Sequence, residues 1–448
     1  MARIIGLNRR AFIRGAGMTA LAGAIGAGSA PAIAADATRA KPANGKYNFD
    51  KAYSRIGTDS IKWDRQMQRF GAANIEVGMG IADMDFQAAP CIGEALAERC
   101  SHENWGYLSN TDSLKEAIAA WSSERHGYEL DPGIIQISDG VHPGLIATLN
   151  AVSPGGTKVL MNTPTYNGFY SDLRATRTQI NDSEMYVDAD GVYQIDWDDL
   201  EARMTPDCHA MLLCNPQNPT GNCWSEEDLL RIGELCLKHE VTVLADEIHC
   251  DFVMKGQKYT PFASLPDKDI VNNSLTFKAI SKTFSLAAMK SAYFFSTNPV
   301  LLERVRAHHH PTTNTLGVVA NEAAYRHGGE WFDQLLPYID QNHDFAEAFI
   351  RERIPLIKYK KAQGTYLAWV DVTELAVAVD AAGNAEKGGF TTPEQYLESW
   401  LAENAHVQLQ DGSWHGTGGA NHMRMNLGAP RPMIEKALNN ISEAVKNI

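Results

Sequence analysis

The chain has 448 residues, more than one hydrophobic core usually spans, so two or three packed units are expected. A hydrophobic fraction of 44% and a charged fraction of 21% are ordinary for a globular enzyme. The formal net charge of −14 argues against nucleic acid or an anionic membrane surface as a partner, because both are bound through basic patches.

The first 35 residues differ in composition from the rest of the chain. The sequence Asn-Arg-Arg-Ala-Phe-Ile-Arg at 8–14 is followed by a Gly- and Ala-rich run at 15–30 and by Ala-Ile-Ala at 32–34. This order is typical of a twin-arginine export signal, so we expect residues 1–35 to be a signal peptide and the mature protein to be periplasmic or otherwise exported. A chance arginine pair before a disordered tail is the alternative.

Residues 36–90 are expected to form a linker and then an N-terminal arm that joins a small domain. The stretch Arg-Ile-Gly-Thr-Asp-Ser-Ile-Lys-Trp-Asp at 55–64 has no clean periodicity, which favours an ordered arm over a core element. A short apolar run at 80–86 contains two acids, Asp83 and Asp85. Beyond it, amphipathic patterns predict helices over 90–99 and 112–126.

Residues 91–320 are predicted to be a large doubly wound α/β domain with a mixed sheet. Apolar runs at 158–161, 210–214, 241–245, 274–280 and 291–296 have the near-continuous hydrophobicity of strands covered on both faces. Ser225 caps a helix between two of these runs, which gives a βαβ crossover. A long helical stretch, strands at 365–370 and 422–426 and a final helix make residues 321–448 a smaller α+β domain.

Polar motifs follow several predicted strands, at the sheet edge where α/β proteins bind ligands. Gly140 and Val141 open a helix, and a helix N-terminus attracts anions. Tyr166 lies on a loop, where it either stacks on a flat ring or serves as a packing aromatic. Asn218 presents an amide from the rigid turn Asn-Pro-Gln-Asn-Pro-Thr-Gly at 215–221.

Asp246 and Lys282 are the candidates for the chemistry. A carboxylate at a buried strand end needs a cation, either an ordinary salt bridge or the protonated nitrogen of a pyridine ring that serves as an electron sink. Lys282 follows the apolar run at 274–280, where desolvation lowers the pKa of an amine and makes it a nucleophile able to form a Schiff base. Most single lysines are surface charges, so the prediction depends on the residues spaced around Lys282.

Those residues resemble a known family. Asn-Pro-x-Asn-Pro-Thr-Gly, then Asp246-Glu247, then Ser281-Lys282 is similar to the fold-type-I enzymes of the class I/II aminotransferase superfamily, which use pyridoxal 5'-phosphate (PLP). The stretches at 55–64, 82–86 and 246–249 resemble the cystathionine β-lyase-like C–S lyase (MalY/PatB) branch of that superfamily. The resemblance covers most of the chain after the leader.

The resemblance implies a PLP site and its residues. Lys282 would hold the aldehyde of PLP and move the substrate proton, and Asp246 would pair with the ring nitrogen. Arg424 would clamp the substrate carboxylate through its guanidinium fork. The residues implied to bind the cofactor are Lys282, Asp246, Asn218, His249, Tyr166, Gly140, Val141, Ser281, Lys290 and Tyr107. Tyr107 would reach the neighbouring subunit's site, which implies a homodimer.

The activity implied is β-elimination from cystathionine or another S-substituted L-cysteine, which gives a thiol, pyruvate and ammonia. Gly80, His142 and Ala279 depart from the branch, which usually has Trp, an apolar residue and Ser or Thr there. The departures at Gly80 and His142 leave an aminotransferase as the alternative. A protein that retains PLP without catalysis is a third hypothesis. Three adjacent histidines at 308–310 point in different directions if helical, so we expect a polar surface or dimer-edge cluster and no metal site.

Overall fold

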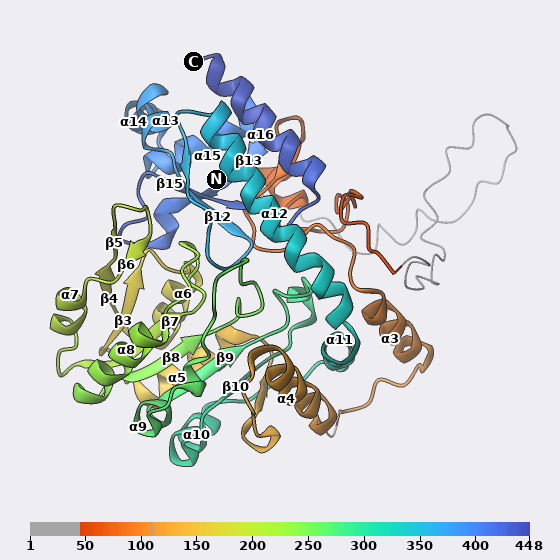
Figure 1. Ribbon diagram of the computed structural model, residues 1–448, viewed down its shortest axis with the longest axis vertical. Coiled ribbons are helices and arrows are strands. Elements are labelled where there is room, and N and C mark those ends of the chain that lie inside the picture. The colour runs from red at the N-terminus through yellow and green to blue at the C-terminus, as the bar shows by residue number, and fades with distance from the viewer. Residues whose placement is uncertain (1–44, 109–110) are drawn as a thin grey trace, which may run out of the picture. The chain divides into compact units, whose positions relative to one another are not determined.

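The computed structural model describes residues 45–108 and 111–448. The predicted signal peptide, residues 1–35, lies outside the described residues. Within them, no helix is both long enough and apolar enough to cross a bilayer. The chain is organised around two sheets, which Figure 1 shows in different parts of the ribbon.

A seven-stranded sheet, the large sheet, forms the main scaffold. Its strands, in spatial order, are β2 (Gln136–Ser138), β10 (Ala292–Phe295), β9 (Ser274–Lys278), β8 (Thr242–Asp246), β7 (Cys208–Cys214), β3 (Lys158–Thr163) and β4 (Gln179–Glu184). Strands β9, β8, β7, β3 and β4 pair in parallel, whereas β10 runs antiparallel to both of its neighbours. The predicted mixed sheet is therefore confirmed, although β4 was not predicted.

Helices cover both faces of the large sheet. Val243 and Ala245 of β8 pack into one hydrophobic core, whereas Leu244 between them packs into the core on the opposite face. This alternation explains why the strand is apolar at every position. The helices of this part are α5 (Val141–Val152), α6 (Gly168–Thr176), α7 (Trp197–Ala202), α8 (Glu226–Lys238), α9 (Lys268–Asn272) and α10 (Pro299–Arg306).

The crossover from β7 to β8 follows the sequence prediction. The Ser225 hydroxyl oxygen accepts a hydrogen bond from the Asp228 N–H, and the Asp228 carboxylate accepts one from the Ser225 N–H. The two bonds form a capping box at the start of α8. Asp246 is the last residue of β8, so the crossover delivers this carboxylate to the carboxyl end of the sheet.

Helices from both ends of the large-sheet region pack together. Helix α11 (Thr315–His327) lies against α3 (Pro90–Ser101) and α4 (Asp112–His126), which match the two predicted amphipathic helices closely. Helix α11 runs without a break through residue 320. The domain boundaries expected after residues 90 and 320 remain predictions.

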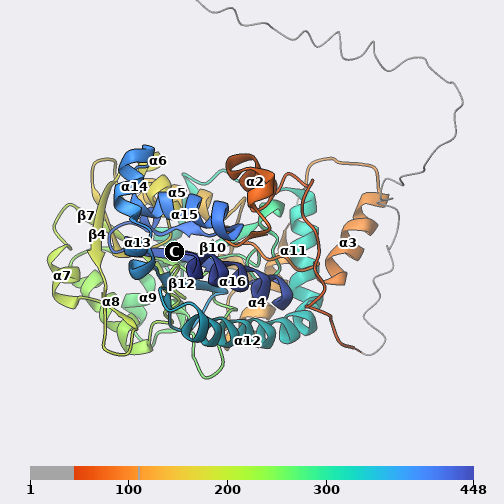
Figure 2. The ribbon, with the colours of Figure 1, turned by 90° about the horizontal axis from the view of Figure 1, so that it is seen from above.

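A four-stranded antiparallel sheet, the small sheet, has its own hydrophobic core. Its order is β11 (Lys358–Tyr359), β12 (Leu367–Asp371), β15 (His422–Asn426) and β14 (Gln410–Asp411). Its helices are α12 (Gly329–Arg353), α13 (Thr373–Ala378), α14 (Ala381–Gly388), α15 (Pro393–Ala405) and α16 (Arg431–Lys446). Helices α12 and α16 lie side by side, as Figure 2 shows.

The N-terminal arm joins the small-sheet region. It contains α2 (Asp64–Phe70), and β1 (Val77–Gly78) pairs in parallel with β13 (Val407–Gln408). The remaining elements are the hairpin β5 (Tyr186–Val187) and β6 (Tyr193–Gln194) and the 3-10 turns η1 (Ala72–Asn74), η2 (Pro132–Ile134), η3 (Phe262–Ser264), η4 (Ala287–Met289) and η5 (Gly412–His415). The arm thereby carries the segment of residues 80–85 to the edge of the large sheet.

Candidate active site

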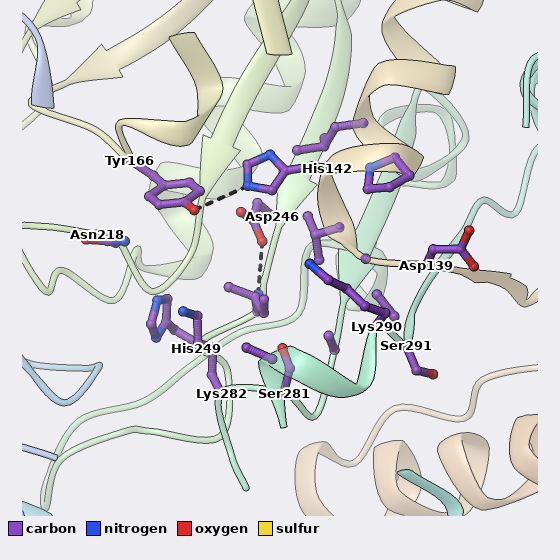
Figure 3. A pocket seen from close by; sticks show the side chains of 18 of the residues that line it. Asp139, His142, Tyr166, Asn218, Asp246, His249, Ser281, Lys282, Lys290 and Ser291 are labelled. Carbon is purple, nitrogen blue, oxygen red and sulfur yellow. Dashed lines mark hydrogen bonds between the residues drawn. The ribbon is translucent and has the colours of Figure 1, made fainter. Parts of the chain in front are cut away.

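A cavity of about 420 Å³ lies at the carboxyl ends of the large sheet's strands (Figure 3). Nine of the predicted site residues line it: Gly140, Val141, Tyr166, Asn218, Asp246, His249, Ser281, Lys282 and Lys290. Two predicted residues do not line it, Arg424 and Tyr107. Positions spread over 150 residues of sequence thus converge because parallel strands end at one edge of a sheet.

Asp246 lies at the floor of this cavity and is 3% exposed. Its Oδ1 accepts a hydrogen bond from the Ile248 N–H at 3.1 Å. Burial raises the pKa of this carboxyl to about 6, and the Ile248 N–H and the positive charges of His142 and Lys282 oppose that rise. No side-chain cation lies within ion-pair distance of it among the described residues, so the carboxylate can accept a cationic group of a ligand.

Lys282 follows β9 and the turn that begins at Ala279. Its Nζ donates a hydrogen bond to the Ala82 carbonyl at 2.8 Å. Burial and the nearby charge of Arg424 lower the pKa of the amine to about 8, although the charges of Asp83 and Asp246 oppose the shift. A larger share of Lys282 than of an exposed lysine is therefore neutral and nucleophilic near neutral pH.

The next residue fixes the backbone that carries Lys282. The Thr283 hydroxyl donates to Asp251 Oδ2 at 2.5 Å, and Asp251 Oδ1 also lies 3.0 Å from His126 Nε2 and accepts from Trp121 Nε1 at 3.1 Å. His126, Asp251 and Cys250 bring three potential metal donors together, but the His126 and Asp251 donors are already engaged in these bonds. We assign this buried cluster to holding the Lys282 turn.

Tyr166, Asn218 and His249 surround the middle of the cavity. Tyr166 lies beyond β3, and burial raises the pKa of its hydroxyl to about 12, so it stays protonated. His249 is 1% exposed, and burial holds the pKa of its imidazole well below the usual range. Its Nδ1 has no hydrogen-bond partner among the described residues. A neutral imidazole and an amide thus face a ligand that lies between Tyr166 and Asp246.

The other end of the cavity suits an anion. Gly140 precedes the first residue of α5 and adopts φ of 152°, a conformation that residues with a side chain rarely adopt. The first N–H groups of α5 have no partners within the helix and point toward this end, where Ser281 adds a hydroxyl and Lys290 a positive charge. Ala279 contributes only a methyl group here.

Arg424 lies on β15 of the small sheet and is 3% exposed. Its Nη1 donates to Asn218 Oδ1 at 3.0 Å and its Nη2 to the Gly80 carbonyl at 3.0 Å, and its Nε has no partner among the described residues. Burial lowers the pKa of the guanidinium to about 10, so it remains charged at neutral pH. It therefore places a positive fork beside Asn218, where a carboxylate of a ligand can be bound.

Tyr107 lies apart from the cavity. Its side chain is fully exposed, as is about half of Trp105, against which Arg99 packs. Within one chain Tyr107 therefore contacts no site residue, and its predicted role depends on a second subunit.

The segment of residues 80–85 lies against Lys282, and sequence reasoning gave Tyr366 and Asn426 no role in holding it. Tyr366 Oη donates to the Ala82 carbonyl at 2.8 Å, beside Lys282. The amide of Asn426 donates to the carbonyls of Ile81 and Asp83, each at 2.6 Å. Asn426 lies two residues after Arg424 on β15, a spacing that places both side chains on one face; nothing distinguished Tyr366 from an ordinary core residue.

The arm motif at 55–64 and the acids of the 80–85 segment form one ionic network. Arg55 makes a bidentate pair with Asp83, both N–O distances being 2.8 Å. Lys62 pairs with Asp85 at 2.5 Å, and both side chains are fully buried. Trp63 Nε1 donates to the other oxygen of Asp85 at 2.9 Å. The sequence motifs at 55–64 and 82–86 are thus the two halves of one contact.

The departure at Gly80 also has a structural counterpart. Gln408 fills the space beside it, since a Cβ at position 80 would lie 2.3 Å from Gln408 Nε2. The Gly80 N–H donates to Gln408 Oε1 at 3.1 Å, and Gln408 Nε2 donates to the buried Glu398 at 2.8 Å. A polar side chain of the small-sheet region therefore occupies the space where the resemblance suggests a large ring.

The histidine run at 308–310 does not reach the cavity. His309 packs edge-on against Phe294, with ring centroids 4.9 Å apart, and His308 and His310 are exposed.

The donor set of the cavity fits PLP. A buried carboxylate without a cationic partner lies at one end, an amine of lowered pKa at the side, and a helix N-terminus with Lys290 at the other end. These groups match a ring nitrogen, an aldehyde and a phosphate. The orphaned His249 Nδ1 adds a polar atom that a ligand can satisfy.

The comparisons with known proteins agree with this geometry. Residues 74–441 match the model of the family "Aminotransferase class I and II". The chain is 37% identical to cystathionine beta-lyase PatB of Bacillus subtilis, over 89% of this chain and 100% of PatB, and 30% identical to protein MalY of Escherichia coli, over 90% and 100%. Its fold is similar to that of cystalysin from Treponema denticola, which contains PLP, with a TM-score of 0.81, 28% identity, and coverage of 90% and 99%.

Proposed function

The chain belongs to the class I and II aminotransferase family and has the type I fold of PLP enzymes, and from that premise we propose that it is a PLP-dependent carbon–sulfur β-lyase. Its substrates are cystathionine or other S-substituted L-cysteines. Each turnover consumes one water and gives a thiol, pyruvate and ammonia. The relatives that support this assignment, PatB and MalY, are matched over their whole length.

One observation carries the proposal. Lys282, Asp246 and the anion end of α5 line one cavity, while the 82–86 stretch, which resembles this branch, contacts Lys282 directly through the Ala82 carbonyl. PLP, when bound, supplies an aldehyde for the substrate amine and a ring that stabilises negative charge at Cα. The carboxylate of Asp246 favours a protonated ring nitrogen, on which that electron-sink property depends.

The residues of the chain then bind and deprotonate the substrate. Arg424, beside Asn218, binds the α-carboxylate and thereby orients the Cα–H bond. Lys282 takes the Cα proton as a neutral amine, which its lowered pKa favours. The electron pair freed at Cα forms the Cα–Cβ double bond as the Cβ–S bond breaks, and sulfur leaves as a thiolate. The 80–85 segment, held by Tyr366 and Asn426, positions the Ala82 carbonyl that accepts a hydrogen bond from Lys282 Nζ.

The test is a substrate screen with the PLP-loaded protein. S-substituted L-cysteines, cystathionine included, are expected to give thiol and pyruvate in equal amounts without an added keto acid. An aminotransferase would instead convert its cofactor to the aminated form and need a keto acid to regain it. Absence of both products with every S-substituted cysteine would refute the lyase assignment.

Lys282→Ala separates catalysis from cofactor retention. Loss of the amine removes both the nucleophile and the base, so turnover is expected to fall by at least about 10³-fold. Lys238→Ala, which removes an exposed lysine paired with Glu201, is the matched control and is expected to keep full activity. Full biological activity in Lys282→Ala would support a protein that only retains PLP.

We propose further that the active form is an exported homodimer. The exposed Trp105, Tyr107 and Leu108 offer an apolar surface on one side of the chain, and the leader at 1–35 has the pattern of a twin-arginine signal. Mixing Lys282→Ala with Tyr107→Ala subunits tests the first part, because a hybrid dimer regains one intact site. Fractionation of cells that express the full chain or a chain with both Arg9 and Arg10 changed to Lys tests the second.

A further inference from the structure

His142 lies in the first turn of α5 and lines the cavity. Its Nδ1 lies 2.7 and 2.9 Å from the two carboxylate oxygens of Asp172, whose side chain is 4% exposed. Its Nε2 lies 3.2 Å from the Tyr166 hydroxyl. Figure 3 shows the imidazole beside Tyr166 and on the same side of the cavity as Asp246. The hydrogen-bonded series Asp172–His142–Tyr166 has no part in the reaction steps proposed above.

The backbone is shaped to accommodate this arrangement. A Cβ at position 168 would lie 2.5 Å from Tyr166 Cε1 and 2.6 Å from His142 Cε1, so the glycine leaves room for both rings. Gly168 begins α6, and Asp172 lies four residues later on that helix, one turn along the same face. Helix α6 therefore supplies both the space and the carboxylate.

The pair fixes the protonation of the imidazole. The Asp172 carboxylate accepts the Nδ1–H, and this hydrogen bond raises the pKa of His142 above its ordinary value, although burial opposes the rise. Asp246 on β8 raises this pKa as well, and Lys282 lowers it. When charged, His142 presents its Nε2–H to the Tyr166 oxygen, because both ring nitrogens are then donors. Its positive charge also lowers the pKa of the Asp246 carboxyl.

We propose that His142, held by Asp172, is a positioning residue that orients the Tyr166 ring over the cofactor and places a positive charge beside Asp246, which keeps that carboxylate ionised for the ring nitrogen. This inference rests on the proposed PLP site. It assigns no contact between His142 and the reacting atoms of the substrate.

The charge effect and the hydrogen bond differ in their dependence on pH. Below the pKa of His142 the imidazole is charged and favours ionised Asp246; above it, only the hydrogen bond to Tyr166 remains. Loss of the hydrogen bond is expected to weaken PLP binding about fivefold at every pH. Without the positive charge of His142 the pKa of Asp246, about 6 in this protein, rises, so binding weakens further near pH 6 and hardly at all near pH 9.

The experiment is a titration of apoenzyme with PLP from about pH 6 to about pH 9, followed through the cofactor absorbance. The dissociation constant of each variant is divided by that of the wild type at the same pH, which cancels the titration of PLP and of Lys282. His142→Leu loses both contributions, so its ratio is expected to lie clearly above 5 near pH 6 and to fall to about 5 near pH 9. His142→Gln keeps an N–H donor without charge, so its ratio is expected to lie above 1 near pH 6 and to fall to about 1 near pH 9.

Two further variants, Asp172→Asn and the surface control His239→Leu, are titrated in the same way. Asp172→Asn keeps the imidazole but removes the carboxylate that keeps it charged, so its ratio is expected to exceed 1 near pH 6 and return toward 1 at high pH. His239→Leu is the matched control, because His239 pairs with Glu201 at 3.1 Å at the surface beyond α8, and its ratio is expected to stay at 1. Thermal unfolding of each apoenzyme checks that the variants are folded.

The outcomes separate this inference from the proposed function. Ratios that are the same at every pH in both His142 variants overturn the effect of the His142 charge on Asp246, and ratios that equal 1 throughout overturn the orientation of Tyr166 as well, while PLP binding by the wild type stands. A wild type that shows no Lys282-dependent cofactor absorbance overturns the PLP site and this inference with it.

Discussion

The two sides of the cavity are built in different ways. On the ring side, Asp246 ends β8, and Tyr166 and Asn218 come three and four residues after β3 and β7. On the side where the substrate is proposed to bind, here called the substrate side, the 80–85 segment forms no helix or strand, and Lys282, Tyr366 and Asn426 are among the side chains that hold it. The hydrogen bonds to it from Lys282 and Asn426 span 200 and 345 positions.

The ring side therefore depends on which side chains are present, whereas the substrate side depends mainly on where the backbone lies. The ring side needs particular side chains, because a carboxylate, an amide and an aromatic ring each do a different job there. On the substrate side, four acceptors are main-chain carbonyls, those of Gly80, Ile81, Ala82 and Asp83, which any residue supplies, whereas the arm contacts use the side chains of Asp83 and Asp85. Variants that remove single groups on each side should therefore affect chemistry and stability differently.

The largest effect is expected on the ring side, from Asp246→Ala. Loss of a buried charge that pairs with a ligand cation costs about 3–5 kcal/mol, which is a loss of roughly 10²- to 4 × 10³-fold in catalytic efficiency. Steady-state kinetics at saturating PLP measure it. Asp207→Ala removes an exposed aspartate at the opposite end of β7 and should leave activity unchanged. Activity within tenfold of wild type in Asp246→Ala would show that the ring side does not depend on this carboxylate.

On the substrate side, Lys62→Met is expected to lower the free energy of unfolding by about 3–5 kcal/mol, because it leaves Asp85 buried without one of its cationic partners. Denaturant unfolding measures the change. Lys436→Met breaks the surface pair with Glu76 and should cost at most about 1 kcal/mol. Activity should fall together with stability in Lys62→Met. If this variant keeps both the stability and the activity of the wild type, the arm does not hold the 80–85 segment in place.

Lys282 joins the two sides, and its pKa of about 8 predicts the pH dependence of cofactor capture. Only the neutral amine attacks the aldehyde, and its fraction rises as pH increases toward this pKa. The second-order rate constant for PLP binding to apoenzyme should therefore rise about tenfold per pH unit well below pH 8 and level off above it. Stopped-flow absorbance measures the rate. A rise that continues to about pH 10, as for an exposed lysine, would contradict the desolvated amine.

The smallest effect is expected from Tyr366→Phe, which removes one hydrogen bond to the Ala82 carbonyl. Its stability should fall by about 1 kcal/mol and its kcat/KM by up to about fivefold. Tyr359→Phe removes another buried tyrosine hydroxyl, 2.6 Å from His343 Nδ1, that does not touch the 80–85 segment. Tyr359→Phe should lose similar stability and keep its activity. Equal activity in Tyr359→Phe and Tyr366→Phe would show that the Tyr366 hydroxyl does not contribute to the site.

Much of the large sheet could be predicted because its strands are apolar at every position and end in polar motifs. The family, the mixed sheet and helices α3 and α4 are confirmed. Strand β4, Gln-Ile-Asn-Asp-Ser-Glu, was missed because its polar residues hide an edge strand that is held by backbone pairing with β3. The predicted roles of the site residues stay predictions, although nine of them line one cavity.

By itself, the sequence determined the strand-end motifs around Lys282 and the combination of a lysine and a buried aspartate as the basis of a predicted PLP site. This was possible because each of those side chains lies within a few residues of a strand end, and such short-range spacing can be read from the sequence. Only the tertiary structure decided that Lys282 donates a hydrogen bond to the Ala82 carbonyl and that Gln408 fills the space beside Gly80. The same holds for the contacts by which His142 connects Asp172 to Tyr166. These contacts join distant segments, often through main-chain atoms, and packing alone brings such groups together.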